Sequence, residues 1–497
     1  MNGKKHSETG TFSPDGMRAE ILNPFVHKLE LDNTYDKIRT AIFTVILLPF
    51  RVIVICYLIV TAWFLACIGL YGLSEEDLRK KPMTGWRRSL KPLICFIGKM
   101  SYLAGGMAIS IRGRQASRKE APILVIAPHS SFLDSCIVYA TRMSSVIVRK
   151  ESMDNYVGKL INYTQPVYVW RDDPNSRQNT IKEIIERATS KEDWPQVLIF
   201  PEGTCTNRSC LITFKPGGFY PGVPVQPVTI RYPNARDTVT WTWEGPGALK
   251  LLWLTLTQVH SSCEIEFLPV YYPSEDEKRD PKLYARNVRD VMAKALGVPV
   301  LDYTYDDCRL IARAKQLGIP CASAIREISE LRAQLGLDRS HLEVHLASEG
   351  LKGKKKWLNK EEFAQRLGVP YDINSQRLFD IFVQNSSGLV NFADYILCAM
   401  FLSLPHAPLS HILSCTFRLY DETHTGFIKC DTFEEIAIRV LGLCREDAQN
   451  TFRQVDLDEK GYITYEEFIK FAKEKNEYAF LFVSDNSFKP KTKPKVQ

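Results

Sequence analysis

The stretch ILVIAPHSSFLDSC, Ile123 to Cys136, decides the fold because it joins an apolar strand-like segment directly to a histidine, two serines and an aspartate. Residues 121–127 are apolar without alternation, which is typical of a strand buried on both faces of a parallel sheet. Pro128 cannot donate to a sheet ladder, so we expect the strand to end there. The stretch therefore predicts an α/β domain with polar groups just beyond the carboxyl end of a strand.

His129 and Asp134 follow this strand end, where open α/β sheets bind their ligands. Side chains five residues apart on one continuous helix point in different directions. The two groups can therefore meet only if His129 lies in a turn before the helix. Ser130 or Ser131 can cap a helix that begins near Phe132, which leaves His129 in that turn.

The region from about Pro82 to Pro299 alternates strand-like runs with helical patterns such as SRQNTIKEIIERATS. This alternation indicates a mixed, largely parallel sheet covered by helices. The expected strands lie in ILVIAP, PVYVW, QVLIFP, VPVQPVTI and EIEFLPV.

Three further polar segments follow expected strands. An arginine just past a strand end can hold a phosphate through its planar guanidinium. A glycine lets the backbone approach a ligand closely. The candidate residues are Arg171 and Arg177 in PVYVWRDDPNSR, Glu202, Gly203 and Thr204 in LIFPEGTCTNRS, and Lys215 in FKPGGFYPGVPVQPV.

The composition suits a multidomain protein that works at a membrane. The 497 residues allow two or three domains, and the net charge of +7 is spread over many short blocks. This charge fits an anionic membrane surface or acidic substrates, and no signature of nucleic-acid binding is present. The 13 cysteines lack paired spacing and several lie in apolar runs, which is typical of reduced thiols and argues against zinc.

The segment from Ala41 to Leu73 is almost wholly apolar, and only Pro49 and Arg51 interrupt it. Its part from Val52 onward is long enough to span a bilayer as a helix. The interruption leaves a second possibility, a re-entrant hairpin that enters the membrane and returns. Basic residues are more numerous after the segment than before it, so we expect the following domain to face the cytosol.

The C-terminal tail KPKTKPKVQ ends with Lys493 and Lys495 in a K-x-K-x-x arrangement. This arrangement resembles a dilysine retrieval signal of endoplasmic reticulum membrane proteins, which is read from the cytosol; a solvated basic tail is the alternative. We expect residence in the endoplasmic reticulum membrane, with the Golgi and lipid droplets also open.

Short helices flank glycine-centred loops from Leu358 to about Phe480, at intervals of about 35 residues. This pattern predicts an all-α EF-hand-like domain. The expected organisation is an N-terminal tail at 1–40, a membrane anchor at 41–73, an α/β catalytic domain at 74–300, a helical connector at 301–357, the EF-hand-like domain at 358–480 and the basic tail at 481–497.

The loop DLDEKGYITYEE offers calcium ligands at Asp456, Asp458, Tyr462 and Glu467. Lys460 replaces an oxygen ligand at its fifth position with a cation, which we expect to weaken affinity. The two earlier loops are poorer, because 421–432 ends in threonine and 383–394 lacks the first aspartate. Calcium is thus a candidate regulatory ligand centred on the last loop.

His129 with Asp134, the strand ending in Arg171, the FPEGT turn and the VPVQPV strand resemble, in order, the four motifs of the glycerophospholipid acyltransferase family. The longer run FPEGTCTNRSCLITFKPG, with RYPN and TVTWTW after it, is similar to the lysophosphatidylcholine acyltransferase 1 and 2 branch, which also carries EF-hands. The resemblance covers nearly the whole chain, from about Leu47 to Phe480.

The resemblance implies transfer of an acyl group from acyl-CoA, long-chain or acetyl, to the free hydroxyl of a lysophospholipid, with no cofactor required. His129 would be the general base and Asp134 would fix its tautomer. Arg171 and Lys215 would bind a phosphate, and the turn 202–204 would orient the glycerol or headgroup. Two alternatives stay open: an ion pair of Arg171 with Asp172 or Asp173, and a buried structural role for Glu202.

The branch favours lysophosphatidylcholine or its alkyl-ether analogue as the acceptor. A lysophosphatidate acyltransferase has the same chemistry, and no motif reports the headgroup. A non-catalytic, calcium-responsive membrane adaptor that retains the fold is the alternative of another class. Intact His129, Asp134, Arg171 and Glu202 argue against the adaptor.

Overall fold

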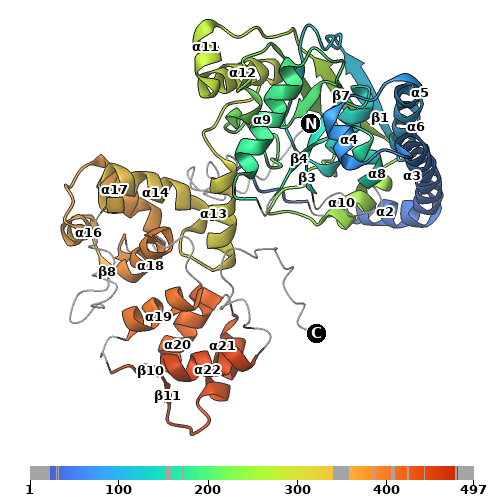
Figure 1. Cartoon of the computed structure of the whole chain (residues 1–497). Helices are drawn as coiled ribbons and strands as arrows, with labels where there is room; N and C mark the ends of the chain where they lie inside the picture. The colour runs from blue at the N-terminus through green and yellow to red at the C-terminus, as the bar shows by residue number, and fades with distance from the viewer. Residues whose placement is uncertain are drawn as a thin grey trace, which may run out of the picture. The chain divides into compact units, whose positions relative to one another are not determined.

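A computed structural model of the 497-residue chain describes residues 23–29, 31, 33–150, 158–170, 173–339, 357–383, 388–403, 409–421, 425–441, 443–475 and 478. The chain divides into two compact units, Met1–Tyr305 and Asp306–Gln497 (Figure 1). The first unit contains the predicted α/β domain and the membrane segment, and the second contains the EF-hand-like region.

A seven-stranded sheet forms the centre of the first unit, with the strand order β1-β7-β6-β2-β5-β3-β4. All neighbouring strands pair in parallel except β6 and β7, so the expected mixed, largely parallel sheet is confirmed. The strands are β1 (Met107–Arg112), β2 (Ile123–Ala127), β3 (Ser145–Arg149), β4 (Val167–Val169), β5 (Val197–Ile199), β6 (Val225–Arg231) and β7 (Ser261–Phe267).

Strand β2 is central and every residue of it is buried. On one face, Ile123 and Val125 belong to a core with residues of α9 (Ser176–Thr189) and α12 (Pro281–Leu296). On the other face, Leu124 and Ile126 pack with residues of α7 (Cys136–Ala140). Helices thus cover both faces, which explains why the strand is apolar without alternation.

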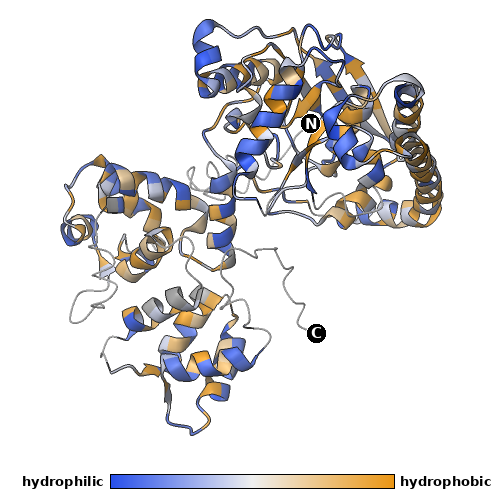
Figure 2. Cartoon of the chain, viewed as in Figure 1, coloured by the Kyte–Doolittle hydropathy of each residue, from blue (hydrophilic) through white to orange (hydrophobic). Residues whose placement is uncertain are grey.

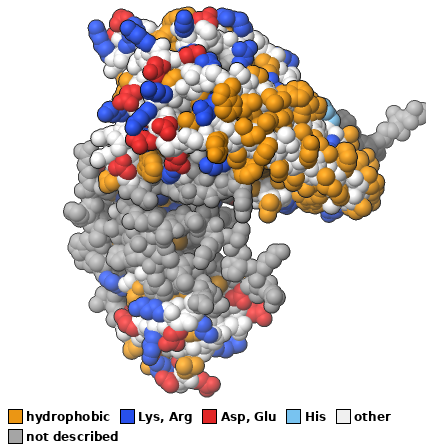
Figure 3. All heavy atoms as spheres, turned by 45° about the vertical axis from the view of Figure 1, so that its right-hand side comes forward, with side chains coloured by type: hydrophobic (Ala, Val, Ile, Leu, Met, Phe, Trp, Pro, Cys, Tyr) orange, Lys and Arg blue, Asp and Glu red, His pale blue; other side chains and the backbone are white. Residues whose placement is uncertain are grey.

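Two consecutive helices, α2 (Thr34–Ile46) and α3 (Leu48–Leu70), form the N-terminal segment, and α3 is hydrophobic along most of its length in Figure 2. Helix α3 packs along α6 (Lys91–Ala104) and α8 (Gly158–Asn162). Much of the outer surface of this region is apolar, as Figure 3 shows. The remaining helices of the unit are α4 (Glu75–Lys80), α5 (Gly85–Ser89), α10 (Ala248–Leu256) and α11 (Glu275–Arg279), with short 3-10 turns η1 (Phe132–Ser135) and η3 (Pro216–Gly218).

The second unit is mainly helical, as predicted, and contains two short antiparallel ladders between loops. One ladder joins β8 (Trp357–Leu358) to β9 (Val390–Asn391), and the other joins β10 (Ile428–Lys429) to β11 (Tyr462–Ile463). The helices are α13 (Tyr305–Gln316), α14 (Ile325–Gln334), α16 (Lys360–Leu367), α17 (Ile373–Phe382), α18 (Phe392–Ser403), α19 (Leu409–Tyr420), α20 (Cys430–Ile436), α21 (Arg445–Val455) and α22 (Tyr465–Glu474), with short helical turns at Ala322–Ala324, Leu337–Arg339 and Ala437–Leu441.

Helix α14 lies within the expected connector, yet it packs against α17 of the EF-hand-like region. The strand β8 at the end of that segment pairs with β9. Residues before 358 therefore contribute a helix and a strand to the packing of the helical unit.

Candidate active site

The turn that follows β2 places the histidine ahead of a helix, as the spacing predicts. Ser131 is the N-cap of η1, and its hydroxyl accepts a hydrogen bond from the backbone N–H of Leu133. The Asp134 carboxylate in turn accepts the N–H of Ser131 at 2.9 Å, which is a capping-box contact. The sequence signals of strand end, turn and cap are thus all present in the structure.

The side chains of His129 and Asp134 face each other, with 2.8 Å between Nδ1 and Oδ2. The same carboxylate oxygen accepts the backbone N–H groups of Ser130 and Ser131. The other oxygen, Oδ1, accepts the phenolic hydroxyl of Tyr232 at 2.7 Å. Asp134 is completely buried, so its charge is stabilised only by these donors.

The environment of His129 favours a basic imidazole. The side chain is 25% exposed, and its ring stacks on Phe200 with 4.3 Å between ring centres. Burial alone would lower the pKa of His129, but hydrogen bonds and charge interactions with Asp134 and Cys205 outweigh it and raise the pKa. Since Asp134 engages Nδ1, Nε2 is the ring nitrogen left for proton transfer.

Glu202 is fully buried and holds the backbone of His129 by a hydrogen bond. Its Oε2 accepts the backbone N–H of His129 at 2.6 Å, and its Oε1 accepts that of Ile212 at 3.4 Å. Burial raises the pKa of Glu202 to about 7, although the two backbone hydrogen bonds oppose the shift. The carboxylate holds the His129 backbone, which fits the buried structural role left open for Glu202. That the turn 202–204 orients the glycerol or headgroup stays a prediction.

Gly203 and Lys215 approach each other closely on the same side of the domain. A Cβ atom at Gly203, whose φ is +68°, would lie 2.8 Å from Cε and Nζ of Lys215. The lysine is exposed, and its ammonium lies 4.6 Å from the ring centre of Tyr305. The Thr204 hydroxyl accepts a hydrogen bond from the indole of Trp243 at 2.9 Å. Only Lys215 of this group presents a charged, exposed side chain.

Of the two arginines expected to bind phosphate, only Arg177 lies within the described residues. Arg171 and the neighbouring Asp172 lie outside the described residues, so the role of Arg171 stays a prediction. Arg177 is exposed in the first turn of α9.

Several residues near the site could not be assigned a role from the sequence. Arg208 donates to the Ser130 hydroxyl at 3.1 Å and to Asp237 at 2.6 Å, and its guanidinium lies over the Tyr232 ring. The backbone N–H of Trp241 donates to the carbonyl of Ser130. Arg208, Tyr232 and Trp241 belong to NRSC, RYPN and TVTWTW, but these letters carry no fixed spacing to the histidine. Their positions follow from the fold alone.

In the last EF-hand loop, a lysine side chain lies beside the carboxylates that were expected to bind calcium. The Lys460 ammonium lies 2.6 Å from Glu467 Oε1 and 3.9 Å from Asp458 Oδ2. Asp456 accepts the backbone N–H groups of Lys460 and Gly461. Within the described parts of the chain, no three Asp, Glu, His or Cys side chains converge as a metal site. Parts of the two earlier loops, 384–387 and 422–424, lie outside the described residues.

Comparisons with known proteins identify the family of the chain. The acyltransferase family model matches residues 108–231, and a model of an EF-hand domain pair matches residues 410–473. Lysophosphatidylcholine acyltransferase of Drosophila melanogaster is 44% identical over 485 residues, which cover 96% of this chain and 90% of the relative. Human lysophosphatidylcholine acyltransferase 1 is 43% identical over 90% of this chain and 84% of the relative, and human lysophosphatidylcholine acyltransferase 2 is 40% identical over 93% and 85%.

The family model and the relatives show that this chain is an acyltransferase, and the paired His129 and Asp134 lie within the matched residues. More narrowly, the chain belongs to the lysophosphatidylcholine acyltransferase branch of the glycerophospholipid acyltransferase family.

Proposed function

We propose that this protein transfers an acyl group from acyl-CoA to the free hydroxyl of lysophosphatidylcholine or its alkyl-ether analogue. The 2.8 Å contact between His129 Nδ1 and Asp134 supports this function above all other observations. The names of the relatives favour the choline headgroup. A non-catalytic adaptor would have no physical use for a buried carboxylate held in place by three other groups.

The chemistry follows from the fixed tautomer. With Asp134 accepting the Nδ1–H, Nε2 of His129 removes the proton of the glycerol hydroxyl as the oxygen attacks the thioester carbonyl. The imidazolium formed is stabilised by the Asp134 charge. Collapse of the tetrahedral intermediate breaks the carbon–sulfur bond, and the proton on Nε2 passes to the leaving CoA sulfur. Because a thioester is already activated, no covalent enzyme intermediate is needed.

Substrate binding is assigned to groups around this turn. The end of the Lys215 side chain lies in the space that a Cβ atom at residue 203 would fill, so a phosphate bound by the lysine would lie close to the Gly203 backbone. We assign Arg171 to the same phosphate-binding role from its position after β4. The turn 202–204 then acts through its backbone and Thr204, since the Glu202 carboxylate is occupied.

We infer that the membrane segment lies in the plane of the membrane, which differs from both the span and the re-entrant hairpin expected from sequence. Near the start of α3, the buried Arg51 donates to the carbonyls of Leu256 and Val259, at the end of α10. Near its other end, the side chain of Arg87 donates to the carbonyl of Gly69. These two attachments are about 27 Å apart along the helix. A helix fixed to the domain over that length cannot cross a bilayer about 30 Å thick without drawing the domain into it.

Helix α3 is long and apolar enough to span a bilayer. Only 17% of its most apolar 18-residue stretch is buried inside the protein, so most of this stretch is exposed. We propose that α2, α3 and the exposed faces of α6 and α10 lie in one leaflet, with the domain on the cytosolic side. The exposed apolar side chains of this surface include Tyr35, Ile42, Ile46, Phe50, Ile53, Tyr57, Val60, Phe64, Phe96, Leu103, Leu249 and Leu252. The dilysine tail, which lies outside the described residues, is the signal we propose for retention in the endoplasmic reticulum.

The active-site turn lies close to this apolar surface. The Tyr102 hydroxyl of α6 contacts the Ser135 hydroxyl at 2.8 Å. The Thr255 hydroxyl of α10 donates to the carbonyl of Thr238, in the segment that also contacts Ser130. These contacts join the active-site turn to helices of the apolar surface, and we propose that the lysophospholipid approaches His129 from the membrane.

Calcium binding is proposed only for the last EF-hand loop, and we infer that it is weak. Asp456, Asp458, Glu467 and the carbonyl of Tyr462 offer the oxygen ligands that calcium takes in an EF-hand loop, whereas the Lys460 ammonium contacts the carboxylates of Asp458 and Glu467. We therefore expect regulation by millimolar rather than micromolar calcium.

The decisive test is CoA release by membranes that contain the full chain or the variant His129→Ala. We expect release from palmitoyl-CoA or acetyl-CoA only with lysophosphatidylcholine, and a fall of roughly 10² to 10⁴-fold in the variant. Equal rates in the two proteins would favour the adaptor, and preference for lysophosphatidate would favour the rival acceptor. Thermal unfolding of both proteins controls for loss of structure.

A further inference from the structure

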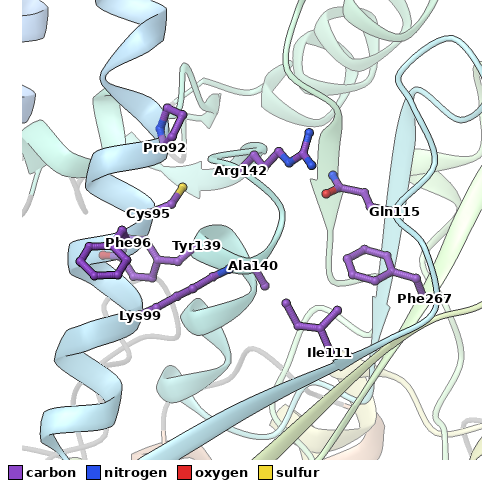
Figure 4. Close-up of a pocket in the computed structure, with 10 residues that line it drawn as sticks. All are labelled: Pro92, Cys95, Phe96, Lys99, Ile111, Gln115, Tyr139, Ala140, Arg142 and Phe267. Carbon is purple, nitrogen blue, oxygen red and sulfur yellow. The ribbon is translucent and has the colours of Figure 1, made fainter.

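Two adjoining hollows lie beside α6, on the opposite half of that helix from the active-site turn. The larger has a volume of about 420 Å³ and is lined mainly by apolar side chains, among them Phe96, Ile111, Tyr139 and Phe267 (Figure 4). The smaller has a volume of about 70 Å³ and its lining includes charged side chains. Arg142 lines both hollows, so the two adjoin at this residue.

These hollows are separate from the catalytic turn. Helix α7 begins at Cys136, next to η1, and its last residue, Ala140, lines the larger hollow. On α6, Tyr102 contacts the active-site side, whereas the hollow is lined by residues that precede it, from Pro92 to Lys99. The long axis of α7 therefore separates the larger hollow from His129.

Besides Arg88, three cations line the hollows, and Asp193 is the acidic residue in the lining of the smaller one. Lys91 is only 8% exposed, and Lys99 and Arg142 line the larger hollow. Within the described residues, none of the three makes a hydrogen bond or an ion pair. Arg88, beside Lys91, is already paired with Asp193. Lys91 is buried, Lys99 is half-buried and Arg142 is exposed. The buried charge of Lys91 is costly without a nearby anion, and the other two cations are free to reach one.

The state of Lys91 shows this cost. Burial, and to a smaller extent the charge of Arg88, lower the pKa of Lys91 to about 8, while Cys95 and Asp193 have smaller opposing effects. An anion beside Lys91 would favour its charged form and so oppose both effects.

The larger hollow is accessible from the membrane-facing surface. Phe96 and Ile111, which line it, are 58% and 44% exposed. Phe96 belongs to the same apolar face of α6 as Leu93 and Leu103. Figure 4 shows Lys99 extending from α6 towards α7, across the hollow. A ligand that arrives from the bilayer would thus meet an apolar chamber bordered by cations.

We propose that the two hollows bind one acidic phospholipid of the membrane, with its phosphate among Lys91, Lys99 and Arg142 and a hydrocarbon chain in the larger hollow. The volume falls in the range of ordinary ligand pockets, and basic pockets beside membrane helices recognise anionic headgroups. A soluble phosphate compound would use the cations but would leave the apolar chamber empty. The proposal does not depend on the catalytic function, since no bond is made or broken.

The test is calorimetric titration of the full-length protein, in neutral detergent micelles, with diether phosphatidate and with diether phosphatidylcholine. Neither lipid has a free hydroxyl, so neither can bind as an acyl acceptor. We expect a clear preference for the phosphatidate. The double variant Lys99→Gln/Arg142→Gln should bind it about 10- to 30-fold more weakly.

A matched control and a neutral variant separate a site from general charge effects. Lys282→Gln/Lys294→Gln removes two charges from α12, on the opposite face of the sheet, and should leave the affinity unchanged. Ala140→Phe fills the larger hollow without changing charge and should weaken binding. If that variant fails to fold, Ile111→Trp blocks the hollow from its exposed edge.

Three results would overturn the proposal. One is phosphatidate binding that the Ala140→Phe and Ile111→Trp variants leave unchanged, because the chain would then lie elsewhere. Another is full displacement of the lipid by millimolar inorganic phosphate, which would show an anion site without lipid specificity. The third is a higher KM of Ala140→Phe for palmitoyl-CoA but not for acetyl-CoA, which would assign the hollow to the acyl donor.

Discussion

The active-site turn and the last EF-hand loop are both short acidic motifs, but the hydrogen-bond partners of their carboxylates lie at different distances along the chain. Asp134 receives a hydroxyl from Tyr232, which is 98 residues away, and the backbone of His129 is held by Glu202, 73 residues away. In the EF-hand loop, Asp456 and Glu467 are satisfied by partners no more than seven residues away. The first motif therefore depends on the folded domain, whereas the second is held by hydrogen bonds within its own loop.

This difference teaches where each motif can fail. The carboxylates of the active site are fully buried, so the loss of one distant partner leaves an unsatisfied charge. The EF-hand loop is largely exposed, and its cation-binding position is already taken by the lysine beside Glu467. A substitution should therefore damage the first site and can improve the second.

The largest expected effect comes from Asp134→Asn, which removes the charge that stabilises the imidazolium. We expect kcat/KM to fall roughly 10² to 10⁴-fold. Because Asp134 raises the pKa of His129, its removal lowers that pKa, and the residual activity should rise with pH at a lower pH than in the wild type. A pH profile of kcat/KM measures both effects, with the surface variant Asp276→Asn as control. An unshifted profile would disprove the link between the two groups.

The next effect is a gain of calcium affinity in Lys460→Asp. The change removes the ammonium near Glu467 and adds an oxygen ligand at the fifth position of the loop. We expect the calcium dissociation constant of the full chain to fall at least about ten-fold, measured by titration calorimetry. Lys470→Asp, on the exposed face of α22, makes the same charge change outside the loop and should have no such effect. Equal affinities of the two variants would show that Lys460 does not limit binding.

A smaller effect is expected from Tyr232→Phe, which removes only the hydroxyl that donates to Asp134 Oδ1. An unsatisfied buried carboxylate oxygen costs about 1 to 3 kcal/mol of stability. Without the hydrogen bond from Tyr232, the negative charge of Asp134 is less neutralised and should raise the pKa of His129 further. The activity should therefore rise at a higher pH than in the wild type. This direction is opposite to that of Asp134→Asn. Tyr272→Phe, at an exposed tyrosine, is the control for thermal unfolding and for the pH profile.

The smallest effect concerns the pH dependence of stability in Glu202→Gln. Burial raises the pKa of Glu202 from 4.5 to about 7. The folded state therefore binds this proton more tightly than the unfolded state, and the resulting stability is present in acid and lost as the pH rises through about 7. Glutamine cannot ionise, so between pH 4.5 and 7 the wild-type midpoint should fall by a few degrees relative to that of the variant. Parallel curves would mean that Glu202 stays charged in the folded protein.

The amino-acid sequence by itself determined the α/β fold, the strand that precedes His129, the capped turn and the pairing of His129 with Asp134. These features are local, because apolar periodicity, a proline and a serine cap act within a few residues. It likewise identified the apolar helix and the EF-hand region. It could not distinguish a spanning helix from one that lies along the domain, since both have the same composition.

Only the tertiary structure decided which groups complete the sites. Tyr232 supports Asp134, the Glu202 carboxylate is turned inward to the His129 backbone, and Arg51 fixes α3 to the end of α10. The unpaired cations Lys91, Lys99 and Arg142 come together from two separate segments of the chain. The physical reason is that a buried charge must be balanced by partners near in space, and the fold alone determines which distant residues those are.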